Sequence, residues 1–392
     1  MDSLYSSTSQ RSLSDAISAL VAYLSRDDRD NHQWLNIRPH ILNGLNTVVC
    51  EGPLSGYSAL LILTAHPQGR QLIKDDNVLR GEITPDGLNS MVAEGDDKGL
   101  SALLFLSNSS EGQQLFIDDE VLRSKITTEG LNALVAKDKS PLFFLASTDK
   151  GRQLLIDDSD LRGKITAEGL NAVLSEGMDK GLSVLFLLAS SPRGRRLLLD
   201  EKGLRGKITE EGLNAIISEG EDKGKTAIIY LAGTSEGRQL LINDAELRGK
   251  ITVDGLNAIV LEGDGNGCSA LLSLSGSNDG RQLLINEKEL RGKITEEGLN
   301  TIMVEGGDKG KSALYFLSGT SEVRQLLIDE KELRDKITPT GLNAIIGEGE
   351  GKGGSALLYL VGSNEGRQLF ENDGLRGKIT PKGLNAFIAE GV

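Results

Sequence analysis

The stretch "EGEDKGKTAI" ends in Gly-Lys-Thr, as loops that bind nucleotide phosphates do. Such a loop reads G-x-x-x-x-G-K-[ST], follows a β-strand and opens a helix. Here only three residues separate Gly220 from Gly224. The residues before them place Leu213, Ile216 and Ile217 at i, i+3 and i+4, which predicts a helix and not a strand. The spacing therefore argues against an ATPase or GTPase.

Related stretches occur elsewhere in the chain, as "EGDDKGLSAL", "EGMDKGLSVL", "EGDGNGCSAL", "EGGDKGKSAL" and "EGEGKGGSAL". The position of Lys225 is held in these copies by Leu100, Leu182, Cys268, Lys311 and Gly354. A lysine that neutralises phosphate charge could not vary so freely, because the phosphates need its charge in every copy. We therefore expect a glycine-rich turn between two helices, repeated along the chain.

Histidine chemistry is confined to the start of the chain, since the three histidines are His32, His40 and His66. General-base or triad chemistry that depends on histidine is thereby excluded from the later repeats. His32 and His40 lie close to Trp34, but a metal site would need more ligands at closer spacing. We expect these histidines to pack in an N-terminal cap.

Acidic clusters give no stronger signal for catalysis. "EGDGNGC" resembles part of a calcium loop, yet the twelfth position counted from Asp264 is Ser275 and not the required glutamate. Pairs such as Asp118 and Asp119 are typical of a solvated surface. The sequence therefore predicts a non-catalytic protein with no cofactor and no metal site.

The composition limits the partners. The 392 residues carry a net charge of −14, whereas nucleic acids and anionic membranes attract basic surfaces. A basic protein or peptide would be favoured electrostatically, although acidity also serves solubility. The two cysteines give no disulfide framework. No run of residues is long and apolar enough for a membrane span, and residues 1–14 lack the apolar core of a secretion signal. We expect a cytoplasmic protein, or a bacterial effector delivered into a host cytosol.

The tripeptide Gly-Leu-Asn recurs nine times, mostly at intervals of 43 residues, which is typical of stacked repeats. It begins at Gly44, Gly87, Gly130, Gly169, Gly212, Gly255, Gly298, Gly341 and Gly383. One unit of this length cannot bury its apolar stripe alone, so the stripes must be buried between neighbours. We expect an all-α protein, an α-solenoid of about eight three-helix repeats over residues 44–392. A helical cap at 15–43 and a disordered tail at 1–14 would precede it.

Three helical segments are expected in each unit. Thr209 is a good N-cap for the first, which would run on through "GLNAIISEG". In three copies a proline follows this threonine, which suits the first helical position. A second helix is expected at 226–233, and a third at 236–248 behind a cap at Thr234 or Ser235. The third unit lacks four residues, which predicts a tighter turn at 137–141.

Three helices in about 43 residues resemble the armadillo and HEAT class of α-solenoids, and pieces such as "SALLFLSNSSEGQQLF" also look like the ankyrin hairpin. In armadillo proteins a ladder of asparagines binds the backbone of an extended peptide. The resemblance implies a comparable role for the asparagines of the repeated tripeptide, with the variable positions beside them. The candidate binding residues are Asn89, Asn132, Asn171, Asn214, Asn257, Asn300 and Asn343. Their neighbours are Ser90, Ala133, Ala172, Ala215, Ala258, Thr301 and Ala344.

The alternative for these asparagines is structural, because an asparagine near a helix start can bond to local backbone or to the next unit. An arginine that follows a leucine in every unit offers a similar choice, as in Arg80 and Arg291. It can bond the last carbonyls of a helix, or pair with the glutamate of the Glu-Gly turn in the next unit. We expect charge networks between units.

The predicted function is therefore a protein-interaction scaffold that binds a protein or extended peptide on its concave surface. The alternative is a self-assembling structural protein whose copies stack through their terminal faces, the C-terminal one above all. An enzyme with its active site in the N-terminal cap or in a groove is a third hypothesis.

Overall fold

The computed structural model describes residues 2–26, 31–134, 139–177, 179–220, 222–261, 266–306, 308–348, 351–371 and 374–389, and the side chains of these except 2–11, 31 and 386–389. The described chain is mostly helical and contains no strand, only isolated bridges at Met91–Ser101 and Ile302–Ser312. The all-α prediction is confirmed. The chain divides into two compact units, Met1–Ser175 and Glu176–Val392, each of which is described by itself.

The first unit opens with two long helices, α1 (Asp2–Leu24) and α2 (Asn31–Gly44), which pack against each other. Residues 2–14, which were expected to belong to a disordered tail, lie in the first turns of α1. Leu20 is fully buried, and the rings of Tyr23 and Trp34 lie 6.1 Å apart between the two helices.

Each complete repeat contains four helices, and not the three that the sequence predicts. In the repeat that begins behind Thr209 they are α18 (Glu210–Asn214), α19 (Ala227–Gly233), α20 (Ser235–Asn243) and α21 (Ala245–Gly249). We call these classes the GLN helix, the buried helix, the amphipathic helix and the Arg helix. The predicted caps are confirmed, since the Thr209 hydroxyl accepts from the N–H of Gly212 at 3.0 Å.

The extra helix arises because the predicted third helix breaks at Asp244. This residue is extended, and its carboxylate accepts the N–H of Leu247 at 3.0 Å, so it caps a new helix. Leu240, Leu241 and Leu247 are all buried as expected, but from two helices that meet at this break.

The predicted first helix is too long, because it ends at Asn214 and not at the Glu-Gly turn. The chain then forms an extended hairpin in which the Ile217 N–H bonds to the carbonyl of Lys225 and the Gly224 N–H bonds to that of Ile217. Ile217 is buried whereas Ile216 is 48% exposed, which is the two-residue alternation of an extended segment. Spacing of i, i+3 and i+4 misled the prediction because only one of these isoleucines faces the core.

The same four classes recur through both units. The GLN helices are α6 (Pro85–Asn89), α10 (Thr128–Asn132), α14 (Ala167–Asn171), α18, α22 (Val253–Asn257), α26 (Glu296–Asn300) and α30 (Pro339–Asn343). The buried helices are α3 (Ala59–Ala65), α7 (Ala102–Ser107), α11 (Pro141–Ser147), α15 (Val184–Ser190), α19, α23 (Ala270–Ser275), α27 (Ala313–Ser318) and α31 (Ala356–Val361). The prolines expected at helix starts occupy the first turns of α6 and α30, which confirms that boundary.

The remaining helices alternate in the same order. The amphipathic helices are α4 (Pro67–Asp75), α8 (Ser110–Asp118), α12 (Asp149–Asp157), α16 (Pro192–Asp200), α20, α24 (Asn278–Asn286), α28 (Ser321–Asp329) and α32 (Asn364–Glu371). The Arg helices are α5 (Asn77–Gly81), α9 (Glu120–Ser124), α13 (Ser159–Gly163), α17 (Lys202–Arg205), α21, α25 (Lys288–Gly292) and α29 (Lys331–Asp335). A 3-10 turn, η2 (Arg376–Lys378), and α33 (Pro381–Ala389) follow. Of the turn predicted at 137–141, residues 137 and 138 lie outside the described residues, and Ser140 and Pro141 form the N-cap and first residue of α11.

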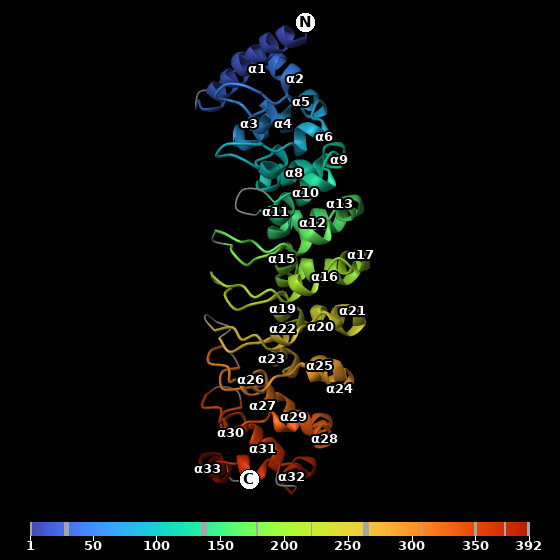
Figure 1. Ribbon diagram of the computed structural model, residues 1–392, viewed down its shortest axis with the longest axis vertical. Coiled ribbons are helices and arrows are strands. Elements are labelled where there is room, and N and C mark those ends of the chain that lie inside the picture. The colour runs from blue at the N-terminus through green and yellow to red at the C-terminus, as the bar shows by residue number, and fades with distance from the viewer. Residues whose placement is uncertain are drawn as a thin grey trace. The chain divides into compact units, whose positions relative to one another are not determined.

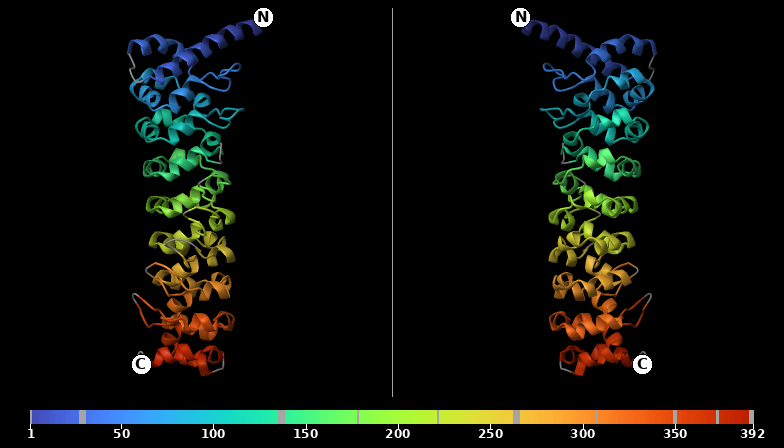
Figure 2. Two further views of the ribbon diagram at one scale, coloured as in Figure 1. Left: turned by 90° about the vertical axis from the view of Figure 1, so that its left-hand side faces the viewer. Right: turned by 90° about the vertical axis from the view of Figure 1, so that its right-hand side faces the viewer.

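The core of each unit is built by buried helices that pack against their counterparts in the next repeat. In the first unit α3 packs on α7 and α7 on α11, and in the second unit α15, α19, α23, α27 and α31 pack in sequence. Within each unit the hairpins lie on one side of the buried helices and the Arg helices on the other (Figure 1). Seen from the side, the repeats of each unit follow one another in chain order (Figure 2). Equivalent side chains are therefore presented in rows.

Candidate functional site

The asparagines of the repeated tripeptide join each repeat to the next. Asn257 lies at the end of α22, and its Oδ1 accepts the N–H of Thr295 at 3.0 Å. Its Nδ2 donates to the carbonyls of Val253, in its own helix, and Lys293, in the next repeat, at 2.7 and 2.8 Å. The corresponding bonds to the next N-cap threonine are Asn46–Thr84, Asn89–Thr127, Asn132–Thr166, Asn214–Thr252, Asn300–Thr338 and Asn343–Thr380. Asn171 donates to the carbonyl of Ala167.

These bonds are the structural role that the sequence offers as the alternative. Both amide hydrogens and an oxygen lone pair of Asn257 are used inside the fold, and the side chain is buried, with 8% exposed. The peptide-binding role of the ladder stays a prediction. A binding surface must be sought among the side chains beside the asparagines that are not engaged inside the fold.

The glycine of the tripeptide is explained by the same contact. A Cβ on Gly298 would overlap the side chain of Asn257, and Gly87, Gly130, Gly169, Gly255, Gly341 and Gly383 meet the preceding asparagine in the same way. Leu299 is fully buried. Glycine thus admits the neighbour, leucine fills the core, and asparagine reaches the next repeat, which accounts for the Gly-Leu-Asn pattern.

The recurrent arginine forms the expected charge network, but with a different partner. Arg291 donates to the carbonyls of Leu284 and Ile285, at the end of α24, and pairs with Glu330 of the next repeat at 2.5 Å. This partner is the N-cap residue of the next Arg helix and not the glutamate of the Glu-Gly turn, because the Arg helices stack on one another. The described pairs are Arg38–Asp76, Arg80–Asp119, Arg123–Asp158, Arg205–Asp244, Arg248–Glu287 and Arg291–Glu330.

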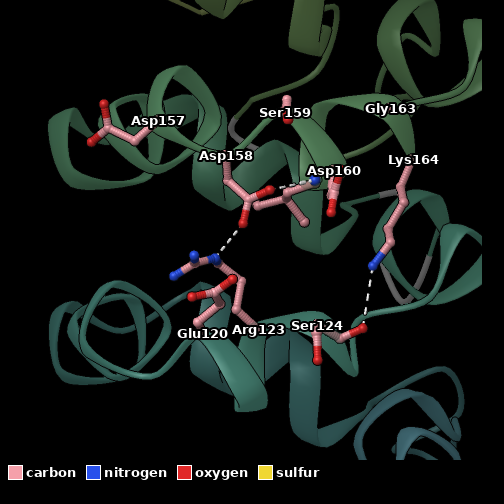
Figure 3. A pocket seen from close by; sticks show the side chains of 10 residues that line it. Glu120, Arg123, Ser124, Asp157, Asp158, Ser159, Asp160, Gly163 and Lys164 are labelled. Carbon is pink, nitrogen blue, oxygen red and sulfur yellow. Dashed lines mark hydrogen bonds and ion pairs between the residues drawn. The ribbon is translucent and has the colours of Figure 1, made fainter.

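A polar pocket of about 630 Å³ lies beside this network in the first unit, between α9 and α13. Figure 3 shows the Arg123 side chain directed at Asp158. Burial alone would raise the pKa of Asp158, but the hydrogen bonds from the Leu161 N–H and from Arg123 outweigh it and lower the pKa. Asp157 and Asp160 are exposed. The most enclosed carboxylate of the pocket is therefore engaged in holding two repeats together.

The Gly-Lys-Thr stretch that suggested a nucleotide site forms the tip and return of a hairpin. The ammonium of Lys225 donates to Asp222 at 2.7 Å, and Gly224 has a φ of 84°. Burial would lower the pKa of Lys225, yet the hydrogen bond to Asp222, together with the charge of Asp222 and the interactions with Tyr230, outweighs this effect and the pKa is raised. Lys225 is thus held by its own turn and does not point into a phosphate-sized loop.

The N-terminal histidines differ from expectation in their packing. Trp34 and Ile41 are buried, whereas His32 and His40 are exposed, because they lie on the other faces of α2. Within the described ranges no three His, Cys, Asp or Glu side chains are placed to hold a metal ion. No helix in that part of the chain is both long and apolar enough to cross a membrane.

A row of aliphatic side chains is exposed beside the asparagines. It consists of the residue two positions after each asparagine, and we call it the apolar row. Its members are Val48, Met91, Leu134 and Val173 in the first unit and Ile216, Ile259, Ile302 and Ile345 in the second. Met91 and Ile216 are 49% and 48% exposed, and Ile259, Ile302 and Ile345 are half-buried. This row could not be recognised in the sequence, because helical spacing places Ile216 on the core face of a helix together with Ile217.

A second row, the acidic row, lies three residues before the asparagines. Its members are Asp86, Glu129 and Glu168 in the first unit and Glu211, Asp254 and Glu297 in the second. All six are exposed, and none forms an ion pair with another described residue. They differ in this from the acidic N-cap residues of the Arg helices, such as Asp119 and Glu330, which are paired with arginine. The repeat of one acidic and one aliphatic residue around six of the asparagines was the signal in the sequence that could have identified the surface.

The two rows meet in a pocket of about 320 Å³ in the second unit. Ile216 and Ile259 of the apolar row line it together with Asp254 and Glu297 of the acidic row, and Val253 adds a further exposed aliphatic group. The pocket therefore offers apolar contact and negative charge to a ligand.

A related pocket of about 360 Å³ lies two repeats further along, lined by Ile302, Ile345 and Pro339. Thr340 and Lys382 stand there at the positions that carry acids in the earlier repeats. The apolar row therefore continues where the acidic row has ended.

No protein-family model matches this chain, and a search of curated proteins finds no relative of it.

Proposed function

We propose that this protein is a non-catalytic interaction scaffold of the α-solenoid type, which binds a partner protein or an extended peptide along the apolar row. The 43-residue period and the helix-on-helix packing support the resemblance to armadillo and HEAT repeats. The resemblance supports a binding role only by analogy, because fold alone does not determine function.

The exposed apolar row is the observation that carries the proposal. Position two after the asparagine is aliphatic in all eight repeats, although its side chain is not needed to fill the core, which is filled by the next residue, such as Ile217 or Val260. Exposed apolar surface rimmed by polar groups is typical of an interaction site. A solvated face would be expected to carry polar residues in at least some copies.

The test is capture of partners from cell lysate by the full chain and by the variant Ile216→Glu/Ile259→Glu. The matched control is Ile242→Glu, because Ile242 is an exposed isoleucine of α20, 37% accessible, outside both pockets. Bound proteins are identified by mass spectrometry, and circular dichroism checks that every variant is folded.

The proposal expects specific proteins to be lost from the row variant and kept by the control. Equal capture by both variants would refute it. Sedimentation velocity distinguishes the proposal from the alternative of a self-assembling protein. The alternative holds if the intact chain is an oligomer, the row variant is a monomer, and the variant still captures every other protein that the intact chain captures.

A further inference from the structure

We propose that the partner segment at the second unit is basic and adopts a polyproline II conformation, with an aliphatic side chain at every third position and Lys or Arg between. This inference rests on the proposed function, because it uses the same apolar row. It is carried by the charge of the acidic row and by the spacing of the repeats.

The charge follows from the pocket in which the rows meet. Asp254 and Glu297 line it, are exposed, and form no ion pair with described residues, so their negative charge is available to a ligand. Glu211 continues the same row in the preceding repeat. An acidic partner would place like charges together, whereas a basic one gains complementary contacts and a faster approach.

The spacing follows from the packing of the buried helices. Helices α19 and α23, and α23 and α27, lie in direct contact, and packed helices are about 8–10 Å apart. Equivalent side chains of successive repeats, such as Ile216 and Ile259, should recur at about this distance. A ligand in register must present one apolar group per repeat.

Polyproline II is the regular conformation that meets this condition. It has three residues per turn and rises about 3.1 Å per residue, so the same face returns after about 9.3 Å. A β-strand returns after about 6.8 Å, and an α-helix after about 5.4 Å. Its backbone makes no internal hydrogen bonds and remains solvated, so the pocket needs only side-chain contacts to hold it.

The point at which the acidic row ends determines which repeats can contact basic residues of the ligand. Ile302, Ile345 and Pro339 line the second pocket, but Thr340 and Lys382 replace the acids there. Basic residues of the ligand should therefore contact the repeats that contain Glu211, Asp254 and Glu297, and only its apolar residues should continue beyond them.

The test is fluorescence anisotropy of labelled peptides with the full chain. The first peptide repeats Leu-Arg-Pro over about twelve residues, enough for four turns of polyproline II. The second has the same composition in scrambled order, and the third repeats Leu-Glu-Pro. The chain variants are Asp254→Lys, Thr340→Glu and the control Asp279→Lys, which reverses an exposed charge on α24 away from the pockets.

We expect the ordered basic peptide to bind about tenfold more tightly than the scrambled one, and the acidic peptide not to bind. Asp254→Lys should weaken binding about fivefold, Thr340→Glu should strengthen it about twofold, and Asp279→Lys should change it by less than about twofold. Equal affinity for ordered and scrambled peptides, no binding of either, or equal effects of the two lysine variants would overturn the inference.

Failure here can be told apart from failure of the proposed function. If the row variant Ile216→Glu/Ile259→Glu loses a captured protein while the peptides are not distinguished, the row binds a partner of another kind. If neither the capture nor the peptide binding depends on the row, both proposals are wrong.

Discussion

Replacement of Asn257 by alanine should destabilise the second unit by about 3 kcal/mol. The side chain makes three hydrogen bonds, to the carbonyls of Val253 and Lys293 and from the N–H of Thr295, and it is 8% exposed. A hydrogen bond contributes about 0.5–1.5 kcal/mol, and a buried partner left unsatisfied costs about 1–3 kcal/mol. Three bonds therefore give a range of about 1.5–4.5 kcal/mol.

The assay is urea unfolding followed by circular dichroism, together with hydrogen exchange of the Thr295 amide. Repeat proteins open locally, so the exchange rate reports the lost contact even where global unfolding is not a single transition. Asn257→Asp should cost more than Asn257→Ala, because a carboxylate would face two carbonyl oxygens. Asn286→Ala is the control, since this asparagine is exposed at the end of α24 and should change stability by less than about 0.5 kcal/mol.

A loss below about 0.5 kcal/mol for Asn257→Ala, with unchanged exchange at Thr295, would refute the assignment of the asparagines as braces between repeats. If that variant also lost a specific partner, the asparagine ladder would be the binding surface that the armadillo resemblance implies.

Three further predictions concern other recurrent positions. Gly280→Ala should lose about 2 kcal/mol or more in urea unfolding, because a Cβ there would overlap backbone of the preceding helix; Gly292→Ala, with open space around it, should be neutral or slightly stabilising, and equal losses would contradict this reasoning. Thr234→Val should lower stability by about 1 kcal/mol, because it removes a helix cap. Thr320→Val should not lower stability, since the buried hydroxyl of Thr320 has no hydrogen-bond partner. A larger drop in melting temperature for Thr320→Val than for Thr234→Val would contradict this assignment of the caps. The pKa of Asp76 is lowered from 3.8 to about 2, chiefly by the hydrogen bond from its arginine partner Arg38. Its contribution to stability is therefore complete above about pH 4 and is lost as the pH falls towards 2. Asp76→Asn should make the urea midpoint less dependent on pH over that range, and an unchanged pH dependence would count against the pair.

Much of the repeat could be predicted because its caps are local. Thr209 and Pro85 define helix starts by chemistry that depends only on nearby residues, and both boundaries are confirmed. The repeat period likewise required only counting. The helix at Asp244 was missed because the same residue types can continue a helix or cap a new one, and the choice depends on packing against the next repeat.

The binding surface was harder to predict for a physical reason. The residues around Ile216 and Ile217 satisfy helical spacing, yet Ile217 is buried by an extended hairpin and Ile216 is left outside. In the described part of this hairpin, Ile217 bonds to the returning segment through its N–H and its carbonyl, and so short a paired segment does not produce a clear alternation in the sequence. The bonds from Asn257 to Lys293 also depend on where the neighbouring repeat lies, which no local pattern specifies.

The fit of Asn257 against Gly298 has a consequence for how the chain can change in length. Each repeat presents an asparagine on one side and accepts one beside its glycine on the other, so its two faces are complementary to those of its own copies. A segment of 43 residues can then be duplicated or deleted within a unit without a new interface having to arise. The interval can also differ from 43 residues, because Gly169 follows Gly130 by 39 residues and still meets Asn132. Selection would therefore preserve the contact between asparagine and glycine, and not the exact period.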